Sequence, residues 1–135
     1  MSYDLMVFDP AVAPRDRAGF MSWYGELTAW GEEHSYDDVS ITTDRLRRWY
    51  TEMLTTFPAM NGPDAADRPY DSPIWDDLHL TDYSIARHAI YCAFSWSVGE
   101  KAFSAVTRLA AKHGVGFFDV SADAGKIHFP DGLIL

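Results

Sequence analysis

Three polar residues come directly after apolar segments and could carry out chemistry together. Asp9 follows residues 5–8, Ser97 follows residues 89–96, and Asp119 lies near the end of residues 115–120. Two carboxylates beside a hydroxyl group could bind a divalent ion or act as general acid and base. Each residue also has an ordinary structural use, because aspartates stabilise turns and serines cap helices. The sequence therefore predicts an alternative ligand site here and no catalytic residue.

The remaining reactive side chains do not form a recognisable motif. Cys92 is the only cysteine and lies in an apolar segment, where a free thiol behaves as a small hydrophobic group. No G-x-S-x-G elbow is present, and Gly114-Val115-Gly116 leads into an expected strand and not into a phosphate-binding helix. The histidines lack the spacing of a zinc site: His34, His79, His88, His113 and His128. We therefore expect no metal site and no cofactor.

The acidic side chains are concentrated in two stretches, residues 26–44 and 64–82. A solvated surface explains such clusters simply, and a docking face for a basic protein explains them functionally. The second interpretation predicts a partner face, in which Trp75 is a candidate anchor among carboxylates. Its members are Glu32, Glu33, Asp37, Asp38, Asp71, Trp75, Asp76 and Asp77.

Length and composition exclude several classes of protein. A chain of 135 residues with 47% hydrophobic residues is expected to fold as a single globular domain, 1–135. The net charge of −9 argues against nucleic-acid binding, which needs clustered Lys and Arg. No apolar run is long enough to span a membrane, and the first residues lack the features of a signal peptide. A cytoplasmic protein is the expectation.

Hydrophobic spacing in the first half predicts a strand and two helices. Residues 5–8 are apolar on both faces, as in a buried strand. Apolar residues recur at helical spacing from residue 20 to 30 and again from 46 to 57. The two helices are expected to form an antiparallel pair. Residues 58–82 are rich in Pro and Asp and predict a long loop.

The second half predicts strands around a third helix. Residues 83–96 indicate a strand, with a second short strand before it. Ser97 and Glu100 fit a capping box for a helix that ends at Gly114. A hairpin follows, formed by residues 115–120 and 126–129.

These elements predict an α+β (α/β-like) fold in the order β-αα-loop-β-α-β-β, with three helices on a small mixed sheet of four or five strands. Right-handed crossovers would make strands 5–8, 89–96 and 115–120 mutually parallel. Asp9, Ser97 and Asp119 would then share the edge at which open α/β sheets bind ligands. A third hypothesis is a homodimer that forms through the exposed edge of the terminal hairpin.

Three segments together resemble a group of small, mostly uncharacterised bacterial proteins: residues 3–8, residues 94–97 with Glu100, and residues 113–119. Some members of that group are similar to immunity proteins encoded beside polymorphic bacterial toxins. The resemblance implies a toxin-neutralising role and a basic toxin as partner, and it carries over no functional residue. The leading hypothesis is therefore a non-catalytic acidic binding protein, and the alternative is a small enzyme or ligand-binding domain.

Overall fold

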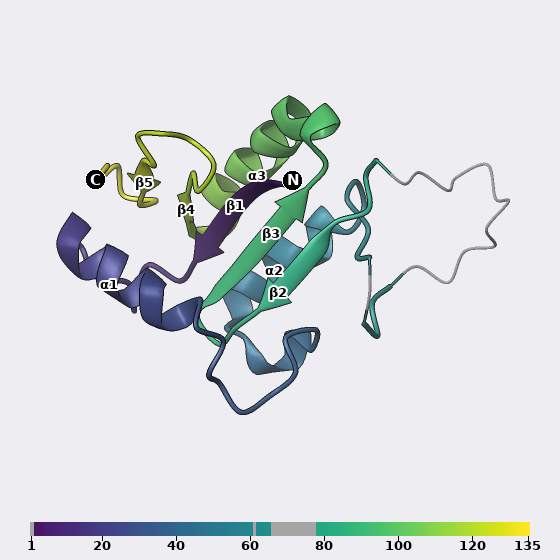
Figure 1. Cartoon of the computed structure of the whole chain (residues 1–135), viewed down its shortest axis with the longest axis horizontal. Helices are drawn as coiled ribbons and strands as arrows, with labels where there is room; N and C mark the ends of the chain where they lie inside the picture. Colours follow the sequence, from purple (N-terminus) through teal and green to yellow (C-terminus); the bar gives the residue numbers. More distant parts are fainter. Residues whose placement is uncertain (1, 61, 66–77) are drawn as a thin grey trace, which may run out of the picture.

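The fold is an α+β arrangement of one five-stranded antiparallel sheet and three α-helices (Figure 1). The computed structural model describes residues 2–60, 62–65 and 78–135. The predicted class and order of elements are confirmed. In chain order the elements are β1 (Tyr3–Phe8), α1 (Arg17–Leu27), a 3₁₀ turn (Val39–Ile41), α2 (Asp44–Met53), β2 (Asp82–Ile85), β3 (Ala89–Phe94), a second 3₁₀ turn (Trp96–Val98), α3 (Gly99–His113), β4 (Gly116–Phe118) and β5 (Ile127–His128).

The strands lie in the order β2-β3-β1-β4-β5, and every neighbouring pair is antiparallel. β3 and β4 flank β1 and therefore run parallel to each other. The prediction that all three strands are mutually parallel is wrong for β1. The connection from β1 to β3 is not a single crossover, because it contains α1, α2 and the additional strand β2.

The two faces of the sheet are covered by different helices. In β1, Leu5 and Val7 pack on the face that carries α2 and α3, whereas Met6 and Phe8 pack on the face that carries α1. Side chains alternate between the faces of a strand, so one apolar segment serves both cores. The predicted antiparallel pairing of the first two helices is wrong: α2 packs beside α3.

The start of α3 also differs from the prediction. Ser97 lies in a 3₁₀ turn, and the helix begins two residues later with Val98 at the N-cap and no capping side chain. The predicted capping box is therefore wrong. The predicted end is confirmed, because Gly114 caps the helix in the left-handed conformation with φ of 67°.

The ends of the predicted loop 58–82 lie side by side. Ala59 forms isolated bridges with Ala65 and Thr81, and the Thr81 N–H donates to the Pro58 carbonyl at 2.9 Å. The terminal hairpin is present, but the free edge expected there is not. Ile127 exchanges backbone hydrogen bonds with Leu135 at 2.9 and 3.2 Å, so the chain's own last residues pair with β5.

Candidate functional site

The antiparallel direction of β1 separates the three residues of the alternative ligand site. Asp9 follows the end of β1 that lies beside the start of β3, and its N–H donates to the His88 carbonyl at 2.9 Å. Ser97 and Asp119 come after the C-terminal ends of β3 and β4, and these two ends lie at the other edge of the sheet. The expectation that all three lie at one edge is corrected: Ser97 and Asp119 share an edge, and Asp9 lies at the other.

Asp9 and Ser97 make local side-chain contacts, whereas Asp119 Oδ1 is buried without a hydrogen-bond partner among the described residues. The Asp9 carboxylate accepts from the Ala11 N–H at 2.9 Å and shapes the turn after β1. The exposed Ser97 hydroxyl lies 2.9 Å from that of Ser95. Burial raises the pKa of the Asp119 carboxyl, and this effect outweighs the opposing influence of His128. No hydrogen bond connects Ser97 with Asp119 among the described residues.

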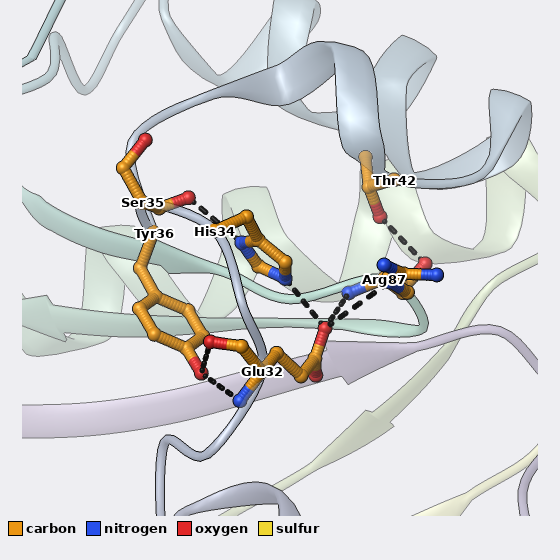
Figure 2. A network of polar contacts seen from close by, with 6 residues as sticks. All are labelled: Glu32, His34, Ser35, Tyr36, Thr42 and Arg87. Carbon is orange, nitrogen blue, oxygen red and sulfur yellow. Dashed lines mark hydrogen bonds and ion pairs between the residues drawn. The ribbon is translucent and has the colours of Figure 1, made fainter.

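Glu32, the first member of the predicted partner face, is the centre of an internal polar network (Figure 2). Its Oε1 accepts from His34 Nε2 at 2.6 Å and from the Arg87 N–H at 3.1 Å. The Glu32 N–H donates to the Tyr36 hydroxyl at 2.8 Å. These contacts fasten the loop between α1 and α2 to the turn between β2 and β3. Glu32 therefore serves the fold and is not available as an unpaired docking charge.

Both ring nitrogens of His34 face acceptors. Nε2 lies 2.6 Å from the Glu32 carboxylate, and Nδ1 lies 2.8 Å from the Ser35 carbonyl. Only the protonated imidazolium can donate from both nitrogens. The hydrogen bond to Glu32 is the main reason that the pKa of His34 is raised, and the Ser35 carbonyl adds to it.

The other predicted carboxylates have different surroundings. Asp38 accepts from the N–H and hydroxyl of Ser40, which lowers the pKa of Asp38 and starts the first 3₁₀ turn. Glu33 is exposed, and Asp37 lines a hollow of about 230 Å³ against β2. The remaining predicted members lie outside the described residues: Asp71, Trp75, Asp76 and Asp77.

An acidic surface that the sequence analysis did not predict lies on the sheet itself. On the face that carries α1, the strand register places Asp82, Ala93 and Asp4 in one row. Ser84 and Tyr91 form the next row. In Figure 1, no described helix lies in front of β2 and β3 on this side. Asp82 is exposed, and the other four side chains are half-buried.

Asp37 extends this surface from the loop side. It lines the 230 Å³ hollow together with Asp82 and Ser84, and the Tyr36 carbonyl accepts from the Ile85 N–H at 2.8 Å to hold the loop there. We define the acidic sheet face as Asp4, Asp37, Asp82, Ser84, Tyr91 and Ala93. This surface presents carboxylates from three separate segments: Asp4 and Asp82 on the sheet face, and Asp37 at the adjoining edge of β2.

The Tyr91 hydroxyl of this region is a hydrogen-bond donor. The Tyr91 hydroxyl donates to Asp4 Oδ2 at 2.5 Å, and burial together with this bond raises the pKa of Tyr91. Burial likewise raises the pKa of Tyr24, which contacts Tyr91. A phenol with a raised pKa remains protonated at neutral pH and is a poor general base. The arrangement favours recognition over proton transfer.

The sequence contained a signal for this surface. Residues 82–85 and 91–95 alternate between apolar side chains and small or polar ones, which is typical of a sheet with one solvated face. That alternation did not reveal that Asp4 and Asp82, which are 78 positions apart, flank the same residue of β3. The information needed was the order and direction of the strands.

Wider comparisons do not identify the chain. No three His, Cys, Asp or Glu side chains among the described residues are grouped closely enough to hold a metal ion. Within the same residues, no helix is both long and apolar enough to cross a bilayer. Comparisons with protein-family models, curated proteins and solved structures give no match. The likeness to small bacterial proteins therefore stays a prediction from the sequence.

Proposed function

We propose that this chain is a non-catalytic acidic protein that binds a basic partner protein in the cytosol. The relationship of an immunity protein to its toxin is the model for this role. One observation carries the proposal: Asp4 and Asp82 lie on one sheet face on either side of Ala93, and Asp37 lies at the adjoining edge of β2, where it lines a hollow with Asp82. The net charge of −9 adds a long-range attraction for a basic partner.

The geometry of the face suits protein recognition. Its carboxylates are distributed over three segments, which supports electrostatic complementarity with dispersed Lys and Arg side chains. The exposed ring of Trp30 lies 6.0 Å from that of Tyr91 and supplies apolar area at the border. Aromatic side chains of this kind commonly anchor interfaces.

The alternative of a small enzyme receives no comparable support. It depended on Asp9, Ser97 and Asp119 at one edge, and Asp9 lies at the opposite end of the sheet. The partner face proposed from the sequence is also modified. Glu32 and Asp38 stabilise the loop, whereas Asp37 and the exposed Glu33 remain available for contacts.

The test begins with capture of partners from the producing cells on the immobilised protein, at low and at higher salt. The captured protein is then purified, and its association rate is measured with the wild type and with Asp37→Asn/Asp82→Asn. Neither carboxylate makes a side-chain hydrogen bond within the described residues, so the fold is expected to persist. The double variant should associate several-fold more slowly at low salt, and the difference should shrink as salt screens the charges.

The matched control is Glu26→Gln/Asp123→Asn, which removes two exposed charges outside the face. If the control slows association as much as the double variant, the acidic sheet face is not the docking surface. If no basic protein is retained at either salt concentration, the proposed function is wrong.

A further inference from the structure

A second surface, at the edge where β1 begins, forms a hollow lined mainly by aromatic side chains. Tyr3, Trp96 and Phe103 line it together with Gly99 and Glu100, and its volume is about 340 Å³. Trp96 is 51% exposed and Phe103 is 37% exposed. Two large aromatic side chains are thus left in solvent beside a space of the size that small ligands occupy.

Contacts with the fold hold the three rings in place. The rings of Tyr3 and Trp96 lie 5.1 Å apart at 55°, and Phe103 packs edge-to-face on Phe117 at 5.7 Å. Gly99 lies under Tyr3: a Cβ at this position would approach the Tyr3 ring to 3.4 Å. Such a distance is an ordinary van der Waals contact, so Tyr3 packs closely against the first residue of α3.

The charged residue that lines the hollow is a carboxylate. Glu100 is exposed and lines the hollow. Asp119 is close enough to Tyr3 to add to the effect of burial and raise the pKa of the Tyr3 hydroxyl. Lys101 lines an adjoining hollow that shares Trp96, Gly99 and Glu100 with the aromatic hollow, and its Nζ lies 3.0 Å from His79 Nε2. The lining of the aromatic hollow therefore contains a carboxylate and no cation.

We propose that this aromatic hollow is a binding site for an organic cation of the alkylammonium class. The faces of aromatic rings attract cations, and a carboxylate at the same site adds direct Coulombic attraction. A strongly hydrated metal ion would lose its water against apolar rings, whereas an alkylated ammonium group is weakly hydrated and fills apolar space. The site does not depend on the acidic sheet face, because Tyr3 lies on the opposite face of β1 from Asp4.

The experiment is a titration of the ¹⁵N-labelled full chain with choline, followed by NMR. The chain has five tryptophans, so the indole N–H signal of Trp96 is assigned from Trp96→Phe. Choline should give a saturable shift of this signal and of the Glu100 amide in the millimolar range. Its uncharged carbon analogue, 3,3-dimethylbutan-1-ol, has the same shape and should bind roughly two- to thirtyfold more weakly, the range expected of a cation–π contact.

Two variants and a control separate the contributions. Trp96→Ala should abolish saturable binding, and Glu100→Gln should weaken choline binding while leaving the neutral analogue unaffected. Glu26→Gln removes one exposed carboxylate from α1, which does not line the hollow, and should change the binding of neither choline nor its analogue. Equal binding of choline and its analogue would show that the hollow recognises apolar shape and not charge, which would overturn the proposal. The absence of saturable shifts would overturn it as well, and so would full binding of choline to Trp96→Ala.

The same titration distinguishes two sources of the cation. An acetylated trimethyl-lysine peptide presents the quaternary group on a protein side chain, and choline presents it free. Tighter binding of the peptide would assign the site to a side chain of a partner, and equal or weaker binding would assign it to a free metabolite. Both results support the cation site, and neither requires the acidic sheet face to bind a protein.

Discussion

The polar network around Glu32 makes a quantitative prediction about stability. Glu32→Gln keeps the shape of the side chain and one acceptor for the Arg87 N–H, but it removes the charge that His34 contacts at 2.6 Å. A hydrogen bond between charged groups contributes about 1.5–3 kcal/mol. The side-chain exposure of His34 is 10% and that of Glu32 is 29%, so solvent screens this pair only in part. We expect a loss of about 1–2 kcal/mol at acidic pH.

The Arg87 side chain adds little to this figure. Its Nε lies 3.9 Å from Glu32 Oε1 and the side chain is 63% exposed, so this ion pair is worth at most about 0.5 kcal/mol. For a domain of this size, 1–2 kcal/mol corresponds to a fall in Tm of roughly 3–10 °C. Thermal unfolding of Glu32→Gln measures this fall in Tm. Glu33→Gln is the control, because Glu33 is an exposed neighbour outside the network.

The pH dependence gives an independent check. The folded-state pKa of His34 is raised, so its stabilising effect is complete below the unfolded value of about 6.5 and is lost as the pH rises through the folded-state value. The difference in stability between wild type and Glu32→Gln should therefore be larger near pH 5.5 than near pH 8.5. A difference that is constant with pH, or a Tm for Glu32→Gln equal to that of Glu33→Gln, would refute the reasoning.

Two further predictions concern the interior of the sheet. Gly116→Ala should destabilise the protein by about 1–3 kcal/mol in urea unfolding, because its Cβ would lie 2.2 Å from Phe8 Cζ and 2.9 Å from the His128 carbonyl oxygen. Gly25→Ala, in an open part of α1, should be neutral or stabilising by up to about 1 kcal/mol, and equal losses for both would contradict the packing described. The Cys92 thiol is fully buried, and burial raises its pKa, so Ellman's reagent should label it only after denaturation. Rapid labelling of the native protein would show that β3 is not enclosed.

Local patterns in the sequence were sufficient to predict the class of the fold and the order of its elements. Apolar spacing identified all three helices, and the glycine at position 114 marked the end of α3 correctly. The start of α3 was misplaced because Ser97 lies in the 3₁₀ turn that precedes the helix, whereas Glu100 lies in the first turn of the helix itself. A capping motif shows only which hydrogen bonds the side chains could make. In the structure α3 starts later, at Gly99, where Tyr3 packs against the helix.

Sequence spacing was not sufficient to predict which faces and edges the elements share. The helices α1 and α2 could pack against each other on one face, or the connection between them could pass around the sheet to the other face. The spacing of apolar residues within the helices is the same in both cases. The loop around Glu32 gives a physical reason for the second path. Its contacts with Arg87 fix the loop at the β2–β3 turn, so α2 begins beside the edge of the sheet and can pack on the face opposite α1.

The direction of β1 links the failed prediction with the aromatic hollow. β3, α3 and β4 do form a unit in which the two strands run parallel, as the crossover argument expects, but β1 lies between them in the opposite direction. Because β1 runs antiparallel to both neighbours, Asp9 lies at the edge away from Ser97 and Asp119, and Tyr3 lies at their edge instead. A pair of acids beside a hydroxyl is thereby replaced by an aromatic side chain beside Trp96, with Asp119 close by. The chemistry available at this edge changes from acid–base catalysis to cation recognition because one strand is reversed.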